Sequence, residues 1–103
     1  MAITVKEETW ELWLYIAGQT PKSILALENI KKYSKEYLSP KYIIEVIDLL
    51  KSPQLAEDDE IFAIPTLVRK APKPSRRIIG DLSDREKVLT GLNIRPITAA
   101  DEK

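Results

Sequence analysis

The side chains that could do chemistry in this chain are few, because its 103 residues include no Cys and no His. The absence of Cys excludes thiol nucleophiles, dithiol exchange and thiolate metal sites. The absence of His excludes imidazole metal ligands and the Ser–His couple of many hydrolases. Carboxylates, lysines, tyrosines and hydroxyls remain, and each cluster of them has a structural interpretation beside the functional one.

Two hydroxyl groups flank a Gly-Gln turn early in the chain, at Tyr15 and Thr20. A hydroxyl of either kind could activate the thiol of a substrate such as glutathione. However, Thr20 followed by Pro21 is typical of a helix N-cap with proline in the first turn, and Tyr15 fits a core position. The structural interpretation is favoured, so we predict no catalytic residue. A Cys-free glutathione-handling enzyme stays open as an alternative.

Two acidic clusters could bind a cation. Residues 57–60 (EDDE) lack the spacing and the glycine of a calcium loop, so they fit a solvated helix end better. Asp81 and Asp84 flank Ser83, and negative charge there would complement the dipole at the start of a helix. We therefore predict no metal ion and no cofactor.

Basic residues gather in the second half of the chain without an intervening acid. The 16 Lys and Arg of the whole chain are balanced by 16 Asp and Glu, so generic attachment to nucleic acid is not expected. A protein partner is favoured, and Trp10, just before the first predicted strand, is a candidate interface anchor. The basic residues are Arg69, Lys70, Lys73, Arg76 and Arg77.

Length and hydropathy predict one small domain over residues 1–103, with residues 1–9 and 97–103 as flexible tails. The first residues show no apolar segment of signal-peptide length. No apolar run approaches the about 18 residues that a membrane helix needs. We therefore expect a cytoplasmic protein that contacts neither membranes nor nucleic acid.

Hydrophobic patterning in the first half predicts a strand, a helix and a second strand. Residues 11–17 carry apolar side chains on both faces, and residues 42–50 are almost continuously apolar. Between them, residues 21–38 place an apolar stripe on one helix face, with Ile24 and Leu25 outside it. Elements of these lengths predict a parallel βαβ unit. The stripe contains Ser23, Ala26, Leu27, Ile30, Tyr33, Ser34 and Tyr37.

Patterns in the second half are shorter and are interrupted by prolines. Residues 54–60 predict a short acidic helix or turn. Residues 61–70 predict a strand in which Pro65 requires a sheet edge, a bulge or a cis bond at the strand start. Residues 76–80 predict a further strand, and a capping box at residues 83–86 opens a last helix. The resulting order, β-α-β-α-β-β-α, is an α/β fold typical of the thioredoxin-like layout.

Three sequence blocks are distinctive: residues 14–23 (LYIAGQTPKS), residues 46–67 (VIDLLKSPQLAEDDEIFAIPTL) and residues 76–92 (RRIIGDLSDREKVLTGL). These blocks resemble the KaiB family of bacterial clock proteins. The blocks occur in the family's order and spacing, and the segment GDLSDREKVL is the most distinctive. The resemblance therefore extends over nearly the whole chain from residue 10 to residue 92.

The resemblance implies a non-enzymatic regulator that binds the ATPase ring of KaiC. KaiB proteins also help to hold KaiA in an inhibited state, and they compete with a histidine kinase whose sensor domain is thioredoxin-like. The family is metamorphic: a thioredoxin-like, usually monomeric state binds KaiC, and a ground state ordered β-α-β-β-α-α-β forms a homo-oligomer, a tetramer or dimer. A permanently thioredoxin-like module that docks to a histidine kinase is the alternative left open.

The same resemblance implies candidate residues for both properties. For the partner interface they are Trp10, Lys22, Leu25, Glu45, Arg76 and Arg77, and for the fold-switch segment they are Pro65, Gly80, Asp81, Gly91 and Asn93. Cyanobacterial relatives carry basic residues at the positions of Leu25, Glu45 and Glu60. They carry an acid at the position of Asn93. These differences indicate a divergent member of the family, with a role in a clock or in stress adaptation.

Two features of the second half make a fold switch physically plausible. Short apolar runs such as residues 61–64 and 88–92 suit a strand or a helix about equally. Gly91 weakens a helix by about 1 kcal/mol relative to Ala, so we predict that Gly91→Ala changes the ratio of the two forms. The sequence leaves open which fold dominates, which KaiC is the partner, and whether the Ile64–Pro65 bond is cis or trans.

Overall fold

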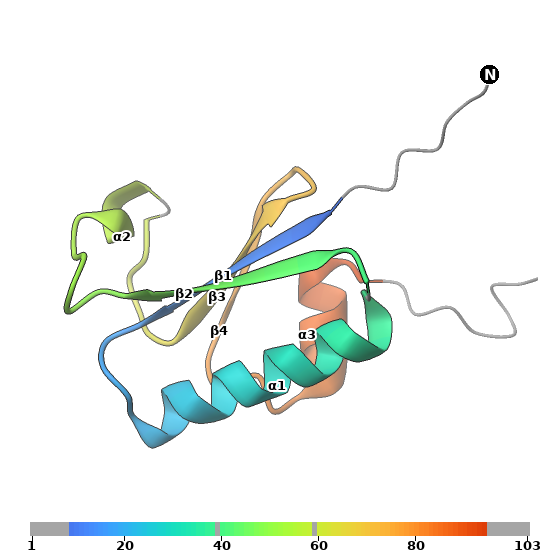
Figure 1. The fold of residues 1–103 in the computed structure, drawn as a ribbon, viewed down its shortest axis with the longest axis horizontal. Coiled ribbons are helices and arrows are strands. Elements are labelled where there is room, and N and C mark those ends of the chain that lie inside the picture. Colours follow the sequence, from blue (N-terminus) through green and yellow to red (C-terminus); the bar gives the residue numbers. More distant parts are fainter. Residues whose placement is uncertain (1–8, 39, 59, 95–103) are drawn as a thin grey trace, which may run out of the picture.

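A four-stranded mixed sheet with helices packed against it forms the body of the protein (Figure 1). The computed structural model describes residues 9–38, 40–58 and 60–94, so the two predicted tails lie outside the described residues except for Thr9. The order of elements is the predicted β-α-β-α-β-β-α. The elements are β1 (Trp10–Ile16), α1 (Pro21–Tyr37), β2 (Tyr42–Asp48), α2 (Leu55–Asp58), β3 (Thr66–Ala71), β4 (Arg76–Ile79) and α3 (Arg85–Leu92).

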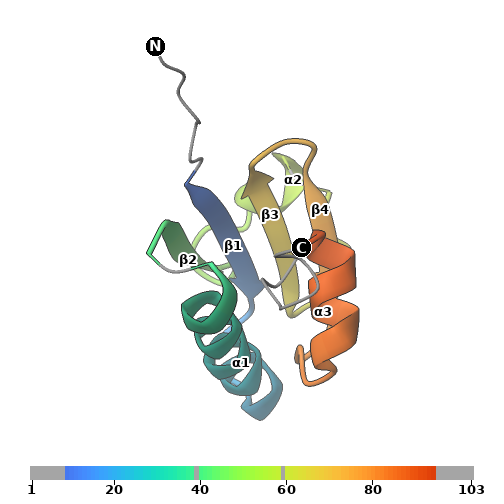
Figure 2. The ribbon, with the colours of Figure 1, turned by 90° about the vertical axis from the view of Figure 1, so that its right-hand side faces the viewer.

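The sheet has the order β2-β1-β3-β4, which leaves β2 and β4 as its edges. β1 pairs parallel with β2 and antiparallel with β3, and β3 pairs antiparallel with β4. Helices α1 and α3 cover one face of the sheet (Figure 2). The short α2 lies away from both, beside the end of the sheet at which β1 terminates (Figure 1). The parallel β1–α1–β2 unit predicted from the sequence is confirmed.

Helix α1 begins where the sequence places a cap. Thr20 is the N-cap: its Oγ1 accepts the Ser23 N–H at 3.1 Å, and the Ser23 Oγ accepts the Thr20 N–H at 2.9 Å. Pro21 follows as the first helical residue, where its missing N–H removes no helical hydrogen bond. Leu38, predicted as the last helical residue, is the C-cap.

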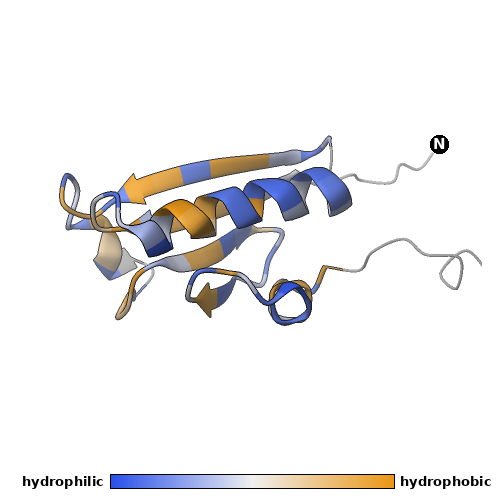
Figure 3. Cartoon of the chain, turned by 90° about the horizontal axis from the view of Figure 1, so that it is seen from below, coloured by the Kyte–Doolittle hydropathy of each residue, from blue (hydrophilic) through white to orange (hydrophobic). Residues whose placement is uncertain are grey.

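The core lies between the sheet and the two longer helices. The apolar stripe predicted for α1 faces it, and Figure 3 shows the matching alternation of hydrophilic and hydrophobic segments along α1 and the strands. Tyr15, on the opposite face of β1, is fully buried as well, which confirms a strand covered on both sides. The core residues are Leu12, Leu14, Ile16, Ala26, Ile30, Tyr33, Leu67, Leu82, Val88, Leu92 and Ile94.

The start of β3 differs from the prediction. The strand begins at Thr66 rather than at residue 61, directly after Pro65, whose peptide bond with Ile64 is cis. Proline has no N–H to donate to a sheet ladder, so the apolar residues before it lie outside the sheet. Of the three alternatives for this proline, the cis bond at the strand start is the one observed, and β3 is a central strand.

The cap of α3 also differs from the prediction, by one residue. Asp84 is the N-cap, because its Oδ1 accepts the Lys87 N–H at 3.2 Å. Ser83 instead donates its N–H to Asp81 Oδ1 at 3.0 Å, so it belongs to the preceding turn. The remaining element bounds lie within two residues of those predicted.

Side chains of α1 hold the loop between β4 and α3. Asn29 Nδ2 donates to the Asp81 carbonyl at 2.9 Å, and the buried Tyr33 hydroxyl donates to the Leu82 carbonyl at 2.9 Å. Leu82 has a left-handed φ of +65°, a conformation that costs a non-glycine residue about 1–3 kcal/mol. Burial of the Leu82 side chain and the two hydrogen bonds from α1 together keep the loop in this shape.

Arg69, one of the basic residues for which the sequence favours a protein partner, is buried. Its Nη1 donates to the Leu92 carbonyl at 2.6 Å, and its Nη2 donates to the Pro74 carbonyl at 2.7 Å. The guanidinium carbon lies 5.0 Å from the centroid of the Trp10 ring. A cation suits this place, because the carbonyls at a helix C-terminus carry partial negative charge. Arg69 thus links β3 to the end of α3 and to the β3–β4 turn.

Candidate partner-binding surface

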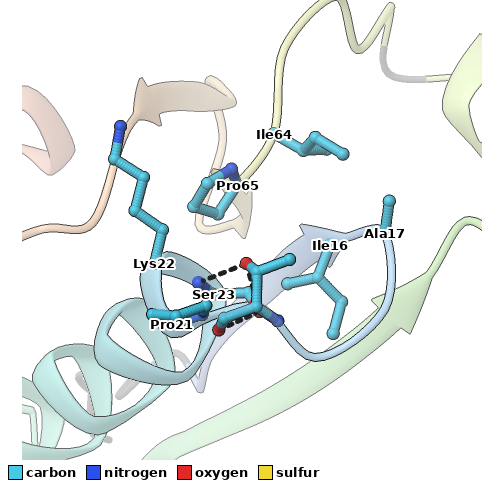
Figure 4. Close-up of a pocket in the computed structure, with 8 residues that line it drawn as sticks. Ile16, Ala17, Pro21, Lys22, Ser23, Ile64 and Pro65 are labelled. Carbon is cyan, nitrogen blue, oxygen red and sulfur yellow. Dashed lines mark hydrogen bonds between the residues drawn. The ribbon is translucent and has the colours of Figure 1, made fainter.

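Three hollows of the described surface meet where β1 ends, and Ile16 lines all three. The largest, of about 370 Å³, lies between the start of α1 and the Ile64–Pro65 segment (Figure 4). A second, of about 300 Å³, lies between α1 and β2, and a third, of about 350 Å³, adjoins the segment after β2. Hollows at the carboxyl ends of strands are frequent binding sites in α/β folds.

Exposed apolar side chains line these hollows or lie at the same end of the molecule. Leu50 is 72% exposed and Phe62 is 87% exposed, although side chains of this size are usually buried. Others line the hollows or adjoin residues that do, on α1, on β2 and on the segment before β3. The start of α1 and the segment between β2 and β3 lie at the same end of the molecule (Figure 1). We call the following set the strand-end surface: Ile24, Leu25, Val46, Leu50, Phe62 and Ile64.

Hydrogen bonds between two turns position this surface. Asp48 Oδ1 accepts the N–H of Gly18, in the turn after β1, and the N–H of Leu50, in the turn after β2, both at 3.0 Å. These bonds favour the charged form and lower the pKa of the Asp48 carboxyl below its usual value. Gly18 has a φ of +76°, and a Cβ there would lie 3.1 Å from Leu50 Cδ1. Glycine therefore lets Leu50 pack against the turn.

The largest hollow carries little reactive chemistry (Figure 4). Thr20 Oγ1 lies 3.1 Å from Ser23 Oγ, and both hydroxyls take part in the helix cap. Lys22, which is exposed, is the one charged residue among those that line this hollow. Tyr15, the other hydroxyl considered as an activator, is buried in the sheet. The lining residues can bind a ligand, but they bring together no nucleophile and general base.

The carboxylates of Asp81 and Asp84 have structural partners. In the part of the chain that the structure describes, no three His, Cys, Asp or Glu side chains come together in a way that could hold a metal ion. Hydrogen bonds from the Ser83 hydroxyl and from its N–H lower the pKa of the Asp81 carboxyl. Asp84 caps α3. Both carboxylates therefore stabilise the loop and the helix start.

The residues predicted for the partner interface lie in three separate places. Lys22 and Leu25 lie at the start of α1 beside the hollows. Glu45 and Arg77 lie in one row across the sheet. Trp10 and Arg76 lie at the end of the sheet where β1 begins. The first pair is the part of the prediction that adjoins the strand-end surface.

Sequence reasoning missed Leu50, Phe62 and Ile64, because it assigned residues 42–50 and 61–70 to strands. A proline that cannot join a ladder is a sign that the apolar residues before it lie outside the sheet. Apolar residues that lie outside the sheet and are exposed can instead serve to bind a partner protein. That sign, Pro65, could have identified the exposed segment from the sequence.

Each residue predicted for the fold switch has a structural reason in the observed fold. Pro65 lines the largest hollow, and Gly80 has a φ of +118°. Asn93 is the C-cap of α3, with a left-handed φ of +60°. A Cβ on Gly91 would lie 2.7 Å from Ile78 Cδ1, so glycine allows α3 to approach β4 closely. The carbonyl of Asp81, in the loop before α3, accepts the hydrogen bond from Asn29 on α1.

The family model of the KaiB domain matches residues 13–94 of the chain. The chain belongs to the KaiB family. It is 52% identical over 92 residues to the circadian clock oscillator protein KaiB of Microcystis aeruginosa, which covers 89% of this chain and 88% of that one. It is also 52% identical over 88 residues to the circadian clock oscillator protein KaiB1 of Synechocystis, covering 85% of this chain and 84% of that one. These relatives of the chain are named as clock proteins and not as enzymes.

Solved structures confirm the thioredoxin-like fold of this KaiB-family chain. The N-terminal domain of Synechococcus elongatus SasA matches with a TM-score of 0.71 and 20% identity, covering 95% of this chain and 97% of that one. Oxidised mitochondrial thioredoxin 3 from Saccharomyces cerevisiae matches with a TM-score of 0.66 and 18% identity, covering 84% and 78%. At these identities the likeness shows the fold alone. Across the described ranges, no helix is long and apolar enough to cross a membrane.

Proposed function

We propose that this KaiB-family chain is a non-enzymatic, cytoplasmic, single-domain regulator that binds a KaiC-type ATPase ring through the strand-end surface. Binding changes the activity of the ring and its access to other partners, in a clock or in stress adaptation. The observation that carries the proposal is an exposed apolar surface that adjoins hollows without catalytic groups. The names of its relatives in the KaiB family support a clock-type partner.

The composition of the strand-end surface supports a protein partner. Contiguous exposed apolar residues on a soluble domain usually mark an interaction site. Phe62 is the most exposed of the large apolar side chains, and truncation of a well-seated interface anchor can cost more than 2 kcal/mol of binding energy. Lys22, Glu28 and Lys51 line the same hollows. An apolar centre with charged residues at its rim is the usual anatomy of a protein interface.

The fold shared with the SasA domain supports competition for one site on the ring. Domains of the same fold can present similar surfaces, so one site can accept either. We propose that the chain competes with the thioredoxin-like sensor domain of a histidine kinase. Where KaiA is present, the ring-bound chain helps to hold it in an inhibited state.

A second arrangement of the chain is part of the proposal, in which the C-terminal half is rearranged and the whole chain runs β-α-β-β-α-α-β. It assembles into a tetramer or dimer and does not bind the ring. The distribution of contacts supports it, since the loop before α3 depends on hydrogen bonds from Asn29 and Tyr33 on α1. Losing these bonds would release the second half while β1, α1 and β2 stay paired. The residues proposed to change conformation are Pro65, Gly80, Asp81, Gly91 and Asn93.

Light scattering on a sizing column tests the proposal, with the chain alone and after hours with its cognate KaiC ring and ATP. We expect the free chain to show an oligomer that slowly yields monomers bound to the ring. Phe62→Ser should weaken ring binding by about tenfold or more. Ile43→Ser is the matched control, because Ile43 is 46% exposed on β2 and pairs with Glu11 at the end of the sheet where β1 begins, away from the strand-end surface. It should bind the ring like the wild type.

Two outcomes contradict different parts of this proposal. A chain that never joins the ring contradicts the KaiB-type regulator. A Phe62→Ser variant that binds as tightly as Ile43→Ser contradicts the strand-end surface as the interface, and the row of Glu45 and Arg77 becomes the next surface to test.

A further inference from the structure

The largest hollow of the strand-end surface has the size and lining of a site for a short segment of chain. Its volume of about 370 Å³ lies near the lower end of the about 300–1,000 Å³ that ligand pockets span, so it accepts one or two side chains rather than a folded element. In Figure 4, Lys22 extends on one side of Pro65 and Ile64 on the other. The apolar walls consist of Ile16, Ala17, Pro21, Ile64 and Pro65.

The main chain on two sides of this hollow is open. β1 and β3 pair as far as Tyr15 and Thr66, and the same register would next place Ile16 opposite Pro65 and then Ala17 opposite Ile64. This pair does not form, because no hydrogen bond of the described residues involves the backbone of Ala17 or Ile64. Ile64 is also 44% exposed. These N–H and C=O groups can therefore bond the main chain of an extended peptide, as a free strand edge does.

The charge at the rim favours an acidic group in the ligand. Lys22 is exposed and makes no ion pair with any residue in the described ranges. The positive charge of Lys22 helps to lower the pKa of the Asp81 carboxyl, but that carboxylate already accepts hydrogen bonds from Ser83. An ammonium group beside apolar walls complements a ligand that presents an apolar group together with a carboxylate.

From these features we infer that the hollow binds an extended peptide segment of a partner protein, in which an apolar side chain is flanked by an acidic one. The apolar side chain enters the hollow, the peptide main chain bonds to Ala17 and Ile64, and the acid pairs with Lys22. This specificity deepens the proposed function, and it rests on that function only for the identity of the protein that supplies the segment.

Selection of random heptapeptides displayed on phage, with the full-length chain as the target, tests this specificity. We expect enriched peptides that share an apolar residue beside Asp or Glu. Adding such a peptide should shift the NMR amide resonances of Ala17 and Ile64. Lys22→Glu should weaken its binding by about tenfold, the loss expected for one charge-assisted contact. Lys32→Glu, the same change at an exposed position of α1 that lines none of the three hollows, should leave binding unchanged.

A second variant tests the apolar wall independently of charge. Ile64→Ser keeps the main chain and removes a side chain that is partly exposed, so the fold should persist while peptide affinity falls by about tenfold. If no peptide is enriched, or if enriched peptides bind the Lys22→Glu chain as tightly as the wild type, the inference is overturned. Ring binding separates the two proposals. If the chain binds the ring but selects no peptide, only the inference of a peptide site in the hollow is contradicted. If the chain selects peptides but never binds the ring, only the proposal of ring binding is contradicted.

Discussion

The β1–α1–β2 unit and the remainder of the fold, from α2 to α3, are held in place in different ways. β1 and β2 pair along seven residues each, and α1 directly connects them, so each element packs on a neighbour in sequence. β3 instead pairs with β1, from which α1, β2 and α2 separate it. The loop before α3 takes its shape from Asn29 and Tyr33 on α1. The second region therefore depends on contacts between residues far apart in sequence.

This difference shows where the fold can be changed. The first region pairs two strands that one helix connects, across a shorter separation in sequence than the β1–β3 pair, so its conformation is specified by its own sequence. The second region is held by the pairing of β3 with β1, by buried apolar residues and by a small number of polar side chains, among them Arg69 and Tyr33. Removing one of these should weaken the second region much more than an exposed substitution of the same kind. The variants below test that expectation, beginning with the largest expected effect.

Arg69→Met should destabilise the second region most strongly. The substitution leaves the buried Leu92 carbonyl without its donor, which costs about 1–3 kcal/mol, and it also removes the part-buried hydrogen bond to the Pro74 carbonyl. We expect the free energy of unfolding in urea to fall by about 3 kcal/mol. Arg76→Met is the matched control on the neighbouring strand, where the arginine is exposed and a substitution changes stability by about 0.5 kcal/mol or less. Equal losses in the two variants would contradict the structural role of Arg69.

Tyr33→Phe should remove one of the links between α1 and the loop before α3. The buried Leu82 carbonyl loses the hydroxyl that donates to it at 2.9 Å, which should cost about 1–2 kcal/mol. Urea unfolding gives the magnitude, and amide exchange should accelerate first in residues 80–85. Faster exchange spread evenly over α1 and the sheet would show that the hydroxyl does not hold this loop in particular.

The same tyrosine makes a pH-dependent contribution. Burial raises the pKa of the Tyr33 phenol above its usual value of 10.0. The stability that the neutral phenol contributes is fully present below about pH 10 and is lost as the pH rises through the folded pKa. Wild-type stability should therefore fall more steeply above pH 10 than that of Tyr33→Phe. Parallel curves for the two proteins would be inconsistent with a raised pKa.

Gly91→Ala tests how closely α3 packs against β4. Alanine favours a helix by about 1 kcal/mol over glycine, but its Cβ would lie 2.7 Å from Ile78 Cδ1 and 2.9 Å from Cγ1. Overpacking of this kind costs about 1–3 kcal/mol, so we expect a net loss of about 1 kcal/mol. Adding Ile78→Ala should make Gly91→Ala stabilising, as a double-mutant cycle would show. A single Gly91→Ala variant that leaves the ratio of two forms unchanged by NMR would contradict a role for Gly91 in the switch.

Asp48→Asn should have the smallest effect on stability. It tests the hydrogen bonds that Asp48 makes within the first region and to the turn that follows it. The bonds from Gly18 and Leu50 lower the pKa of the Asp48 carboxyl below its usual 3.8. The stability that the carboxylate contributes is present above that pH and is lost as the pH falls through the folded pKa. The wild type should lose more stability on acidification than Asp48→Asn, measured by thermal unfolding between about pH 5 and pH 2. Equal losses of stability in the two proteins on acidification would show that these bonds do not stabilise the turns.

The fold of the first region could be predicted from the sequence because its signals are local. The Thr20 cap, the stripe on α1 and the apolar faces of β1 each specify one element. In the second region, the start of β3 and the cap of α3 were misplaced, since short apolar runs and adjacent Ser83 and Asp84 allow more than one assignment. The buried position of Arg69 could not be predicted, because a charge pattern does not show which carbonyls will meet it in space.

The candidate site was less predictable than the fold. The resemblance named Lys22 and Leu25, which lie at the start of α1 near the hollows, but it also named Trp10 and Arg76 at the opposite end of the sheet. Phe62 was missed because an exposed apolar residue in a short run looks like a strand residue in sequence. Exposure is a property of the folded chain, so only the structure could identify the strand-end surface.

Hydrogen–deuterium exchange of the chain with and without its cognate KaiC ring and ATP tests the central claim most directly. The account predicts that ring binding protects the amides of residues 18–25 and 49–64, which carry or adjoin the strand-end surface, and leaves the β3–β4 turn at residues 72–75 unchanged. Protection centred on the β3–β4 turn, or an exchange pattern that the ring does not alter, would contradict it.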